Sequence, residues 1–135
     1  MRSPGSLVPN QPVLEAPAAT TAFQAIIDHP GTSIMGAEAQ GQIVSMATLH
    51  LLPNVTYGGR PYGLIENVVT LPAHRGRGFG AAVMHALLDR AWAAEAYKVM
   101  LLTGKTYGAR DFNEKLGFEA DDKFGMTLRR APPRF

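Results

Sequence analysis

The sequence predicts an α/β fold of the α+β type, in which a mixed sheet of about six strands is flanked by three to four helices. The first observation is the order of apolar periodicities along the chain, which reads helix, three strands, helix, strand, helix and further strands. The second is size and composition, since 135 residues with 46% hydrophobic and 18% charged side chains are typical of one folded domain. We place that domain at residues 20–135, after an extended or disordered arm over residues 1–19 that is rich in proline.

The first expected element is a short amphipathic helix. Thr20 or Thr21 can cap its start, and the apolar residues that follow recur at helical spacing as far as Asp28. His29-Pro30-Gly31 then stops it.

Three strands are expected next. Apolar-rich runs over residues 33–39 and 43–52 flank Gln40-Gly41-Gln42, a pattern that predicts two antiparallel strands joined by a tight turn. Residues 53–61, with two adjacent glycines, are expected to form a loop or irregular hairpin, and residues 62–70 form the third strand.

The second half of the chain predicts two helices and the remaining strands. From Phe79 to about Glu95 the apolar residues keep helical spacing: Val83, Met84, Leu87, Leu88 and Ala91. A short buried strand over residues 97–103 and a helix over residues 109–116 follow, with Gly117 as the C-terminal cap of that helix. The last strands are placed at residues 118–120 and 124–130.

Composition excludes several classes of function. The chain has no cysteine, so disulfide scaffolds, thiolate zinc sites and an enzyme thiol nucleophile are excluded. Its net charge is only +2 and its basic residues are dispersed, which argues against nucleic acid as a partner. No apolar run approaches the roughly 18 residues of a membrane span, and no secretory signal is apparent, so we expect a cytoplasmic protein. The four histidines lack ligand spacing, so no metal is expected.

The most informative segment runs from a buried strand through a turn into a helix, over residues 68–83. The turn contains three glycines and two arginines: Gly76, Gly78, Gly80, Arg75 and Arg77. Such a turn directs backbone N–H groups and the positive end of the helix at one point, and glycine lets a ligand approach the main chain. We therefore expect an anion site suited to a pyrophosphate.

Two common phosphate-binding loops do not match this turn. The Walker pattern requires Gly-Lys-Ser/Thr, and no such lysine follows here. The dinucleotide fingerprint G-x-G-x-x-G also fails, because the spacing here is G-x-G-x-G and the strand before it follows antiparallel strands.

The turn resembles instead a signature of the GNAT superfamily of N-acetyltransferases. Arg75-Gly76-Arg77-Gly78-Phe79-Gly80 matches the family's Q/R-x-x-G-x-G/A pattern, and residues 109–118 resemble its second landmark, A-x-x-F-Y-E-K-L-G-F. The resemblance covers roughly residues 20–130 and implies a mostly antiparallel sheet that is splayed at the middle. Residues 65–69 and 97–99 are similar to the glucosamine-phosphate acetyltransferase branch.

The resemblance implies that acetyl-CoA binds along this segment. The pyrophosphate would contact the N–H groups of the turn, contributed by Arg75, Gly76, Arg77, Gly78, Phe79 and Gly80. The pantetheine arm would pair like an extra strand with Val68, Val69 and Thr70, where an open strand edge can satisfy its amides. Thr103 and Thr106 could bond the same arm.

Direct attack of an amine on a thioester needs a proton acceptor, an oxyanion donor and a proton for the leaving thiolate. Glu66 is the candidate base, directly or through water, and the N–H of Val68 or a neighbour would face the thioester oxygen. Asn113 occupies the position where most family members carry the tyrosine that protonates the thiolate, and an amide cannot supply that proton. Asn113 is therefore either a cofactor contact or a residue of the helix surface, and Tyr107 is a second candidate acid.

The sequence leaves two functions open. The preferred one is an acetyl-CoA-dependent N-acetyltransferase acting on a small-molecule amine or an exposed protein amine. The alternative is a non-catalytic acyl-CoA-binding or regulatory module, which Asn113 motivates. Either residues 7–14 form a minimal version of the first strand usual in the family, or that edge of the sheet is left for a partner subunit to cover. The second alternative favours a homodimer.

Overall fold

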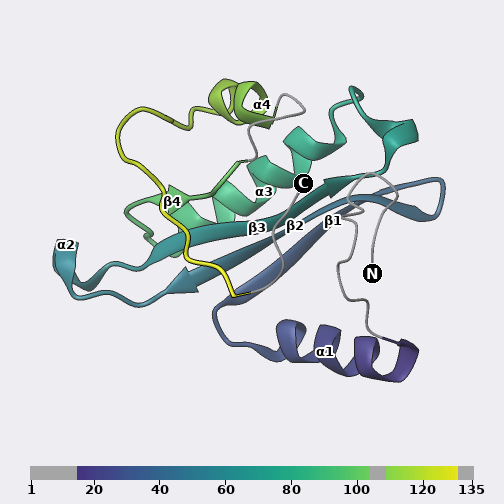
Figure 1. The fold of residues 1–135 in the computed structure, drawn as a ribbon, viewed down its shortest axis with the longest axis horizontal. Coiled ribbons are helices and arrows are strands. Elements are labelled where there is room, and N and C mark those ends of the chain that lie inside the picture. The colour runs from purple at the N-terminus through teal and green to yellow at the C-terminus, as the bar shows by residue number, and fades with distance from the viewer. Residues whose placement is uncertain (1–14, 104–108, 131–135) are drawn as a thin grey trace.

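The computed structural model describes residues 15–103 and 109–130, and these form one sheet covered by helices on both faces (Figure 1). The chain order in the described part is α1, β1, β2, α2, β3, a 3-10 turn, α3, β4 and α4. Figure 1 shows α3 and α1 on opposite sides of the sheet, with α4 on the same side as α3. The mixed α/β architecture predicted from the sequence is thus confirmed.

The sheet contains four strands among the described residues, in the order β1-β2-β3-β4. They are β1 (Thr32–Ala39), β2 (Gln42–Leu52), β3 (Tyr62–Thr70) and β4 (Val99–Met100). The first three pair antiparallel and β4 pairs parallel with β3. Gln40 and Gly41 between β1 and β2 have φ of 53° and 76°, the positive values that a tight two-residue hairpin turn requires.

Four α-helices cover the sheet and its ends in the described part of the chain. They are α1 (Ala16–Asp28), α2 (Thr56–Gly59), α3 (Phe79–Ala93) and α4 (Ala109–Lys115). A 3-10 turn over Pro72–His74 connects β3 to α3. Helix α4 ends in a Schellman arrangement, in which the N–H groups of Gly117 and Phe118 donate to the carbonyls of Glu114 and Asn113. Gly117 has a φ of 101°, so it caps this helix as predicted.

The hydrophobic core lies between the sheet and α3. The α3 side chains Val83, Met84, Leu87 and Ala91 are buried, which confirms the apolar stripe read from the sequence. They pack on residues that alternate along the strands, chiefly Ala47, Leu49 and Ile65. Phe112, Leu116 and Phe118 close the same core from α4 and the turn after it.

The opposite face of the sheet is more polar, and α1 lies on this side (Figure 1). The register pairs Thr32 with His50 and His50 with Leu64, and it pairs Thr48 with Glu66. Because paired and alternate residues share a face, these side chains all lie opposite the core. We call this surface the α1 face.

The prediction of about six strands is wrong for the described residues. The strand expected at residues 97–103 is reduced to Val99–Met100, and residues 118–120 and 124–130 form no strand. Phe124, Met126 and Leu128 alternate as strand residues do, yet each is more than 90% exposed. Alternation alone therefore misled the prediction, because a strand also needs a neighbouring backbone to pair with.

Helix α1 begins at Ala16, four to five residues before the predicted cap. Pro17 lies in the first turn of α1, where the missing N–H costs no hydrogen bond. Proline is therefore compatible with the start of this helix, although the sequence prediction treated the proline-rich segment as non-helical. Thr20 and Thr21 lie within the helix and donate to the carbonyls of Ala16 and Pro17. The first-strand prediction at residues 7–14 lies outside the described residues. No helix of the described ranges combines the length and the apolar composition needed to cross a membrane.

Candidate functional site

A β-bulge interrupts β3 where it passes the predicted site. Met46 pairs with Val69 and Thr48 with Glu66, so Ala47 on β2 faces two residues of β3, Asn67 and Val68. Asn67 has a φ of 57°, in the left-handed region that asparagine tolerates better than most residues. A bulge of this type turns backbone groups out of the ladder. The sequence predicted a regular strand here, and the only signal of a bulge was an asparagine inside the strand pattern.

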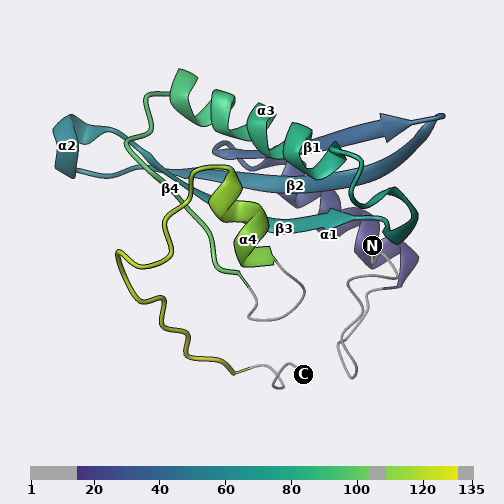
Figure 2. The ribbon, with the colours of Figure 1, turned by 90° about the horizontal axis from the view of Figure 1, so that it is seen from above.

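The edge of β3 opposite β2 is open beyond its first residues. Strand β4 pairs with β3 only at Gly63 and Leu64, and Figure 2 shows the chain after β4 turning away from β3. Among the described residues no strand pairs with this side of β3 from Ile65 to Thr70. The sheet therefore leaves an unpaired edge at the segment expected to pair with the pantetheine arm.

The end of β3 is held by defined hydrogen bonds on both sides. The Leu71 N–H points toward β2 and donates to the Val44 carbonyl at 2.8 Å. Because successive residues of a strand direct their N–H and C=O groups to opposite sides, those of Thr70 point toward the open edge. There the Arg75 Nε donates to the Thr70 carbonyl at 3.2 Å. The Ser45 hydroxyl lies 2.8 Å from the Thr70 hydroxyl and 3.2 Å from the Val69 carbonyl. These contacts fix the strand end from which the Gly/Arg turn departs.

The Gly/Arg turn, residues 75–80, leaves open space where side chains would otherwise project. Gly76 and Gly78 have φ of 73° and 87°, and a Cβ built on either would meet nothing within 4 Å. Gly78 is the N-cap of α3, no side chain caps that end, and the first turn of α3 holds no acidic residue. The first N–H groups of α3 therefore lack a partner within the helix and point outward. This turn fits a diphosphate.

Gly80 serves a different purpose from the two outer glycines. A Cβ at Gly80 would lie 3.3 Å from the Thr70 hydroxyl and 3.5 Å from the Phe112 ring. The first turn of α3 therefore packs closely on both the end of β3 and α4. This close packing holds the uncapped N-terminal end of α3 beside the open edge.

The two arginines of the turn are exposed and add positive charge. The Arg77 guanidinium lies 5.7 Å from the centre of the Phe79 ring, and Arg75 is held by Thr70 as described. Both arginines belong to the turn that leads into α3, so their charges lie near the N-terminal end of this helix. Positive charge near a helix N-terminus favours an anionic ligand.

Glu66 lies on the α1 face immediately before the bulge. Its side chain is exposed, and within the described ranges its carboxylate makes no hydrogen bond or ion pair. Val68 follows in the bulge and is 43% exposed. The structure thus brings Glu66, the bulge and the open edge of β3 into one short stretch of strand.

Asn113 does not lie on the helix surface, so that reading is wrong. It is one of few buried polar residues in the described part and is only 8% exposed. Its amide donates to the Ala109 carbonyl at 3.0 Å, and its Oδ1 is buried without a hydrogen-bond partner among the described residues. Thr103 is exposed after β4. Thr106 and Tyr107 lie outside the described residues.

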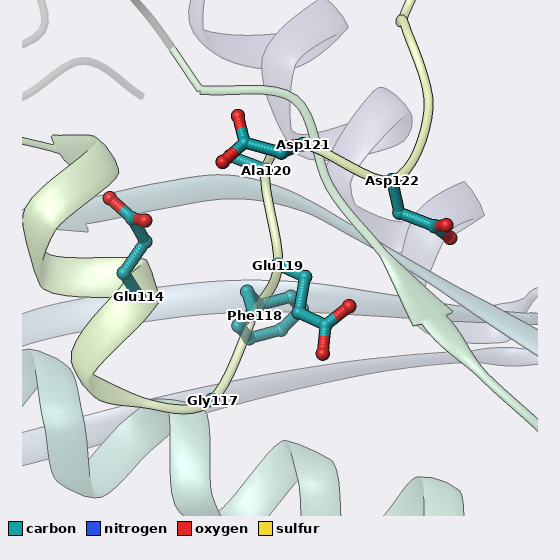
Figure 3. Close-up of a pocket in the computed structure, with 7 residues that line it drawn as sticks. All are labelled: Glu114, Gly117, Phe118, Glu119, Ala120, Asp121 and Asp122. Carbon is teal, nitrogen blue, oxygen red and sulfur yellow. The ribbon is translucent and has the colours of Figure 1, made fainter.

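A hollow of about 570 Å³ lies beside the end of α4 and does not coincide with the predicted site. Figure 3 shows the residues that line it, which are Glu114, Gly117, Phe118, Glu119, Ala120, Asp121 and Asp122. Arg110 pairs with two of its four carboxylates, those of Glu114 and Asp121. Because negative charge dominates its lining, this hollow is unsuited to a pyrophosphate.

Comparison with known proteins identifies a family. Residues 6–118 match the acetyltransferase (GNAT) family. A curated relative, the glucosamine 6-phosphate N-acetyltransferase of Trypanosoma brucei brucei, is 37% identical over 92 residues. That match covers 68% of this chain and 61% of the relative, so the chain spans less than two thirds of its length.

Solved structures agree with the family assignment. A putative acetyltransferase from Agrobacterium tumefaciens str. C58 is 43% identical, with a TM-score of 0.83 over 90% of this chain and 85% of that one. An acetyltransferase from Trypanosoma brucei is 32% identical, with a TM-score of 0.73 over 87% of this chain and 82% of that one. The resemblance read from the two sequence landmarks is therefore confirmed.

Proposed function

This chain belongs to the GNAT family of acetyltransferases, and from that premise we propose that it transfers the acetyl group of acetyl-CoA to a primary amine. The observation that carries the proposal is the combination of an open β3 edge with the uncapped, glycine-lined start of α3. The two features lie next to each other because Gly80 packs directly on Thr70.

The cofactor contacts follow from this arrangement. The N–H groups of residues 75–80, with the guanidinium groups of Arg75 and Arg77, bind the pyrophosphate. The backbone of Val68, Val69 and Thr70 pairs with the amides of the pantetheine arm, as an added strand would. Thr103, Thr106 and Asn113 remain candidate contacts of the same arm. When bound, acetyl-CoA supplies the acetyl group as a thioester.

The remaining groups of the chain perform the acid–base chemistry. Glu66 accepts the proton of the incoming ammonium at its carboxylate, so that the amine attacks in its neutral form. The N–H of Val68, turned out of the ladder by the bulge, donates to the thioester oxygen as negative charge develops there.

The leaving thiolate does not depend on Asn113. The Asn113 amide donates to the Ala109 carbonyl, and an amide N–H is not acidic enough to transfer its proton to a thiolate. A thiol has a reference pKa of about 8.5, so the thiolate can leave unprotonated or take a proton from water or from Tyr107.

The acceptor amine is the least defined part of the proposal. The curated relative is a glucosamine 6-phosphate N-acetyltransferase, which makes glucosamine 6-phosphate the first acceptor to test. An aminoglycoside such as kanamycin and a peptide with a free N-terminus represent the other classes of amine.

The test is release of coenzyme A, measured with a thiol reagent in the presence of each acceptor. Because the chain has no cysteine, every thiol detected comes from the cofactor. Acceptor-dependent release is the expected result. Binding of CoA without release by any acceptor would favour the alternative, a non-catalytic acyl-CoA-binding module, for which the replacement of the usual tyrosine by Asn113 is the motivating observation. Absence of CoA binding would overturn both.

A further inference from the structure

The open edge of β3 ends at a carbonyl that already has a hydrogen-bond donor. The Val69 carbonyl and the Leu71 N–H both contact β2, through Ser45 and Val44, so the Thr70 carbonyl between them points toward the open edge. The Arg75 Nε donates to this carbonyl at 3.2 Å. A side chain of the Gly/Arg turn is therefore bonded to the last acceptor of the edge.

The proposed cofactor contacts use both partners of this bond. In the proposed function the Thr70 backbone pairs with the pantetheine arm, and the Arg75 guanidinium binds the pyrophosphate. Breaking the bond makes both groups available at once. Keeping it leaves the arm to compete with Arg75 for the same carbonyl.

The Thr70 side of the bond is held in place. The Thr70 hydroxyl lies 2.8 Å from the Ser45 hydroxyl, and Gly80 of α3 packs against it so closely that an added Cβ would lie 3.3 Å away. The strand end is thus held by β2 on one side and by α3 on the other. Release of the carbonyl must come from movement of Arg75.

The Arg75 side chain is free to make that movement. Its own N–H donates to the Pro72 carbonyl at 3.3 Å, which fixes the main chain from which the side chain departs. The side chain itself is exposed, and within residues 15–103 and 109–130 the Thr70 carbonyl is the only hydrogen-bond partner of its guanidinium. Only one contact therefore has to break.

A diphosphate competes well for this arginine. The contact with Thr70 is single, and 3.2 Å is at the long end of the range for N–H···O hydrogen bonds. A guanidinium can instead bind a phosphate through two parallel N–H···O bonds between opposite charges, which are shorter and stronger. The exchange of partners is therefore favourable when a diphosphate lies at the turn.

We propose that Arg75 couples the two halves of the cofactor. It covers the Thr70 carbonyl until a diphosphate at the Gly/Arg turn takes its guanidinium, and the carbonyl then pairs with the pantetheine arm. The coupling rests on the proposed function, since it requires CoA to use this edge and this turn. Arg75 is thus a specificity-determining residue that disfavours pantetheine thioesters without phosphate, because these leave the carbonyl covered.

The alternative is an arginine that keeps its place. A guanidinium has five N–H donors, so Nε could stay on Thr70 while the outer N–H groups bind phosphate. The two halves of the cofactor would then bind independently. Coupling requires that each half raise the affinity for the other by the same factor.

The first measurement uses the two halves as separate ligands of the full chain. ADP carries a diphosphate without the arm, and pantetheine carries the arm without a phosphate. NMR titration of the protein amides gives both dissociation constants. Saturating ADP is expected to raise the affinity of the wild-type chain for pantetheine by about threefold to tenfold, the contribution of one hydrogen bond.

The decisive variant is Arg75→Met, which keeps an unbranched side chain and removes every donor. Because the position is exposed, the fold should be retained. Without ADP this variant should bind pantetheine more tightly than the wild-type chain by the same factor, and ADP should give no further gain. Arg77→Met is the matched control. It removes the same charge from the same turn, but the Arg77 guanidinium lies against the Phe79 ring, so this variant should keep the coupling.

The second measurement needs no pantetheine. The carbonyl ¹³C signal of Thr70 should shift when ADP alone is added to the wild-type chain, because the carbonyl loses its donor. The same signal should not respond to ADP in Arg75→Met. The Val44 carbonyl, bonded to the Leu71 N–H on the β2 side, is the internal reference and should stay in place.

A pantetheine affinity that ADP leaves unchanged in the wild-type chain, or raises equally in Arg75→Met, would overturn the coupling in favour of the fixed arginine. Pantetheine that fails to bind Arg75→Met would overturn it too, because the uncovered carbonyl would then gain nothing. Binding of CoA by the wild-type chain is measured first. Its absence would overturn the proposed function, whereas its presence without coupling would overturn only the role of Arg75.

Discussion

The two faces of the sheet differ in what they contribute. The face toward α3 is filled by apolar side chains such as Ala47, Leu49 and Ile65, all nearly inaccessible to solvent. The α1 face carries Thr32, Thr48, His50 and Glu66 on the same three strands. Because strand residues alternate between faces, one sequence supplies both sets. Stability is concentrated on one face and the proposed chemistry on the other, so substitutions on the two faces should have separable effects.

The largest effect is expected in the core. Leu87 is fully buried in the cluster between α3 and the sheet. Leu87→Ala should lower the free energy of unfolding by about 2–5 kcal/mol, because the lost apolar contacts leave a cavity. Urea denaturation measures the change. Leu102→Ala, at a side chain that is 69% exposed, is the control and should change stability little. Equal losses of unfolding free energy in the two variants would contradict the conclusion that stability is concentrated in the core between α3 and the sheet.

On the α1 face, Glu66→Gln should affect activity and leave stability nearly unchanged. The carboxylate is exposed, and the amide has the same shape, so the free energy of unfolding should change by less than about 0.5 kcal/mol. We expect kcat to fall about a hundredfold at neutral pH, the typical contribution of a general base. Glu38→Gln on β1 is the control. An unchanged rate in Glu66→Gln would remove Glu66 from the mechanism.

The Gly/Arg turn permits a comparison of two glycines with similar backbone. Gly78 and Gly41 have φ of 87° and 76°, and both would place a Cβ in open space. Alanine at either position should cost about 1–2 kcal/mol of stability through backbone strain. Only Gly78→Ala should also weaken CoA binding, by about tenfold, because the proposed site binds the phosphates through backbone N–H groups of this turn. Calorimetric titration with CoA measures this, and equal affinities would place the pyrophosphate elsewhere.

The smallest effect is expected at the exposed arginines. Arg77→Gln should weaken CoA binding by about threefold and make it less sensitive to salt, because exposed charges are screened. Arg90→Gln, in the last turn of the same helix, is the control. A salt dependence that is the same in both variants would show that Arg77 makes no contact with the phosphates.

Much of the fold could be predicted from local sequence patterns. Strand β3 has the predicted bounds, the Gln40-Gly41 turn has the predicted geometry, and α3 buries the predicted stripe. These elements are encoded by periodicity and by glycine at positions of positive φ, which are local properties. The two family landmarks also identified the family, because each combines several residues at fixed spacing.

The predictions that failed concern neighbours distant in the sequence. Residues 124–130 have the alternation of a strand, but in the described structure no strand lies beside them for backbone pairing. One of the two readings of Asn113 put it on a helix surface, whereas the packing of α4 buries it. Neither outcome can be read from a local window, since both depend on which segments meet in space.

The amino-acid order by itself determined where chain direction changes, which helix face is apolar and where glycines leave the turn before α3 without side chains. Only tertiary structure decided that β4 diverges from β3, that Asn67 adopts a left-handed conformation opposite Ala47, and that the Arg75 guanidinium meets the Thr70 carbonyl. The physical reason is that register and strand separation result from competition among packing and backbone hydrogen bonds across the whole sheet.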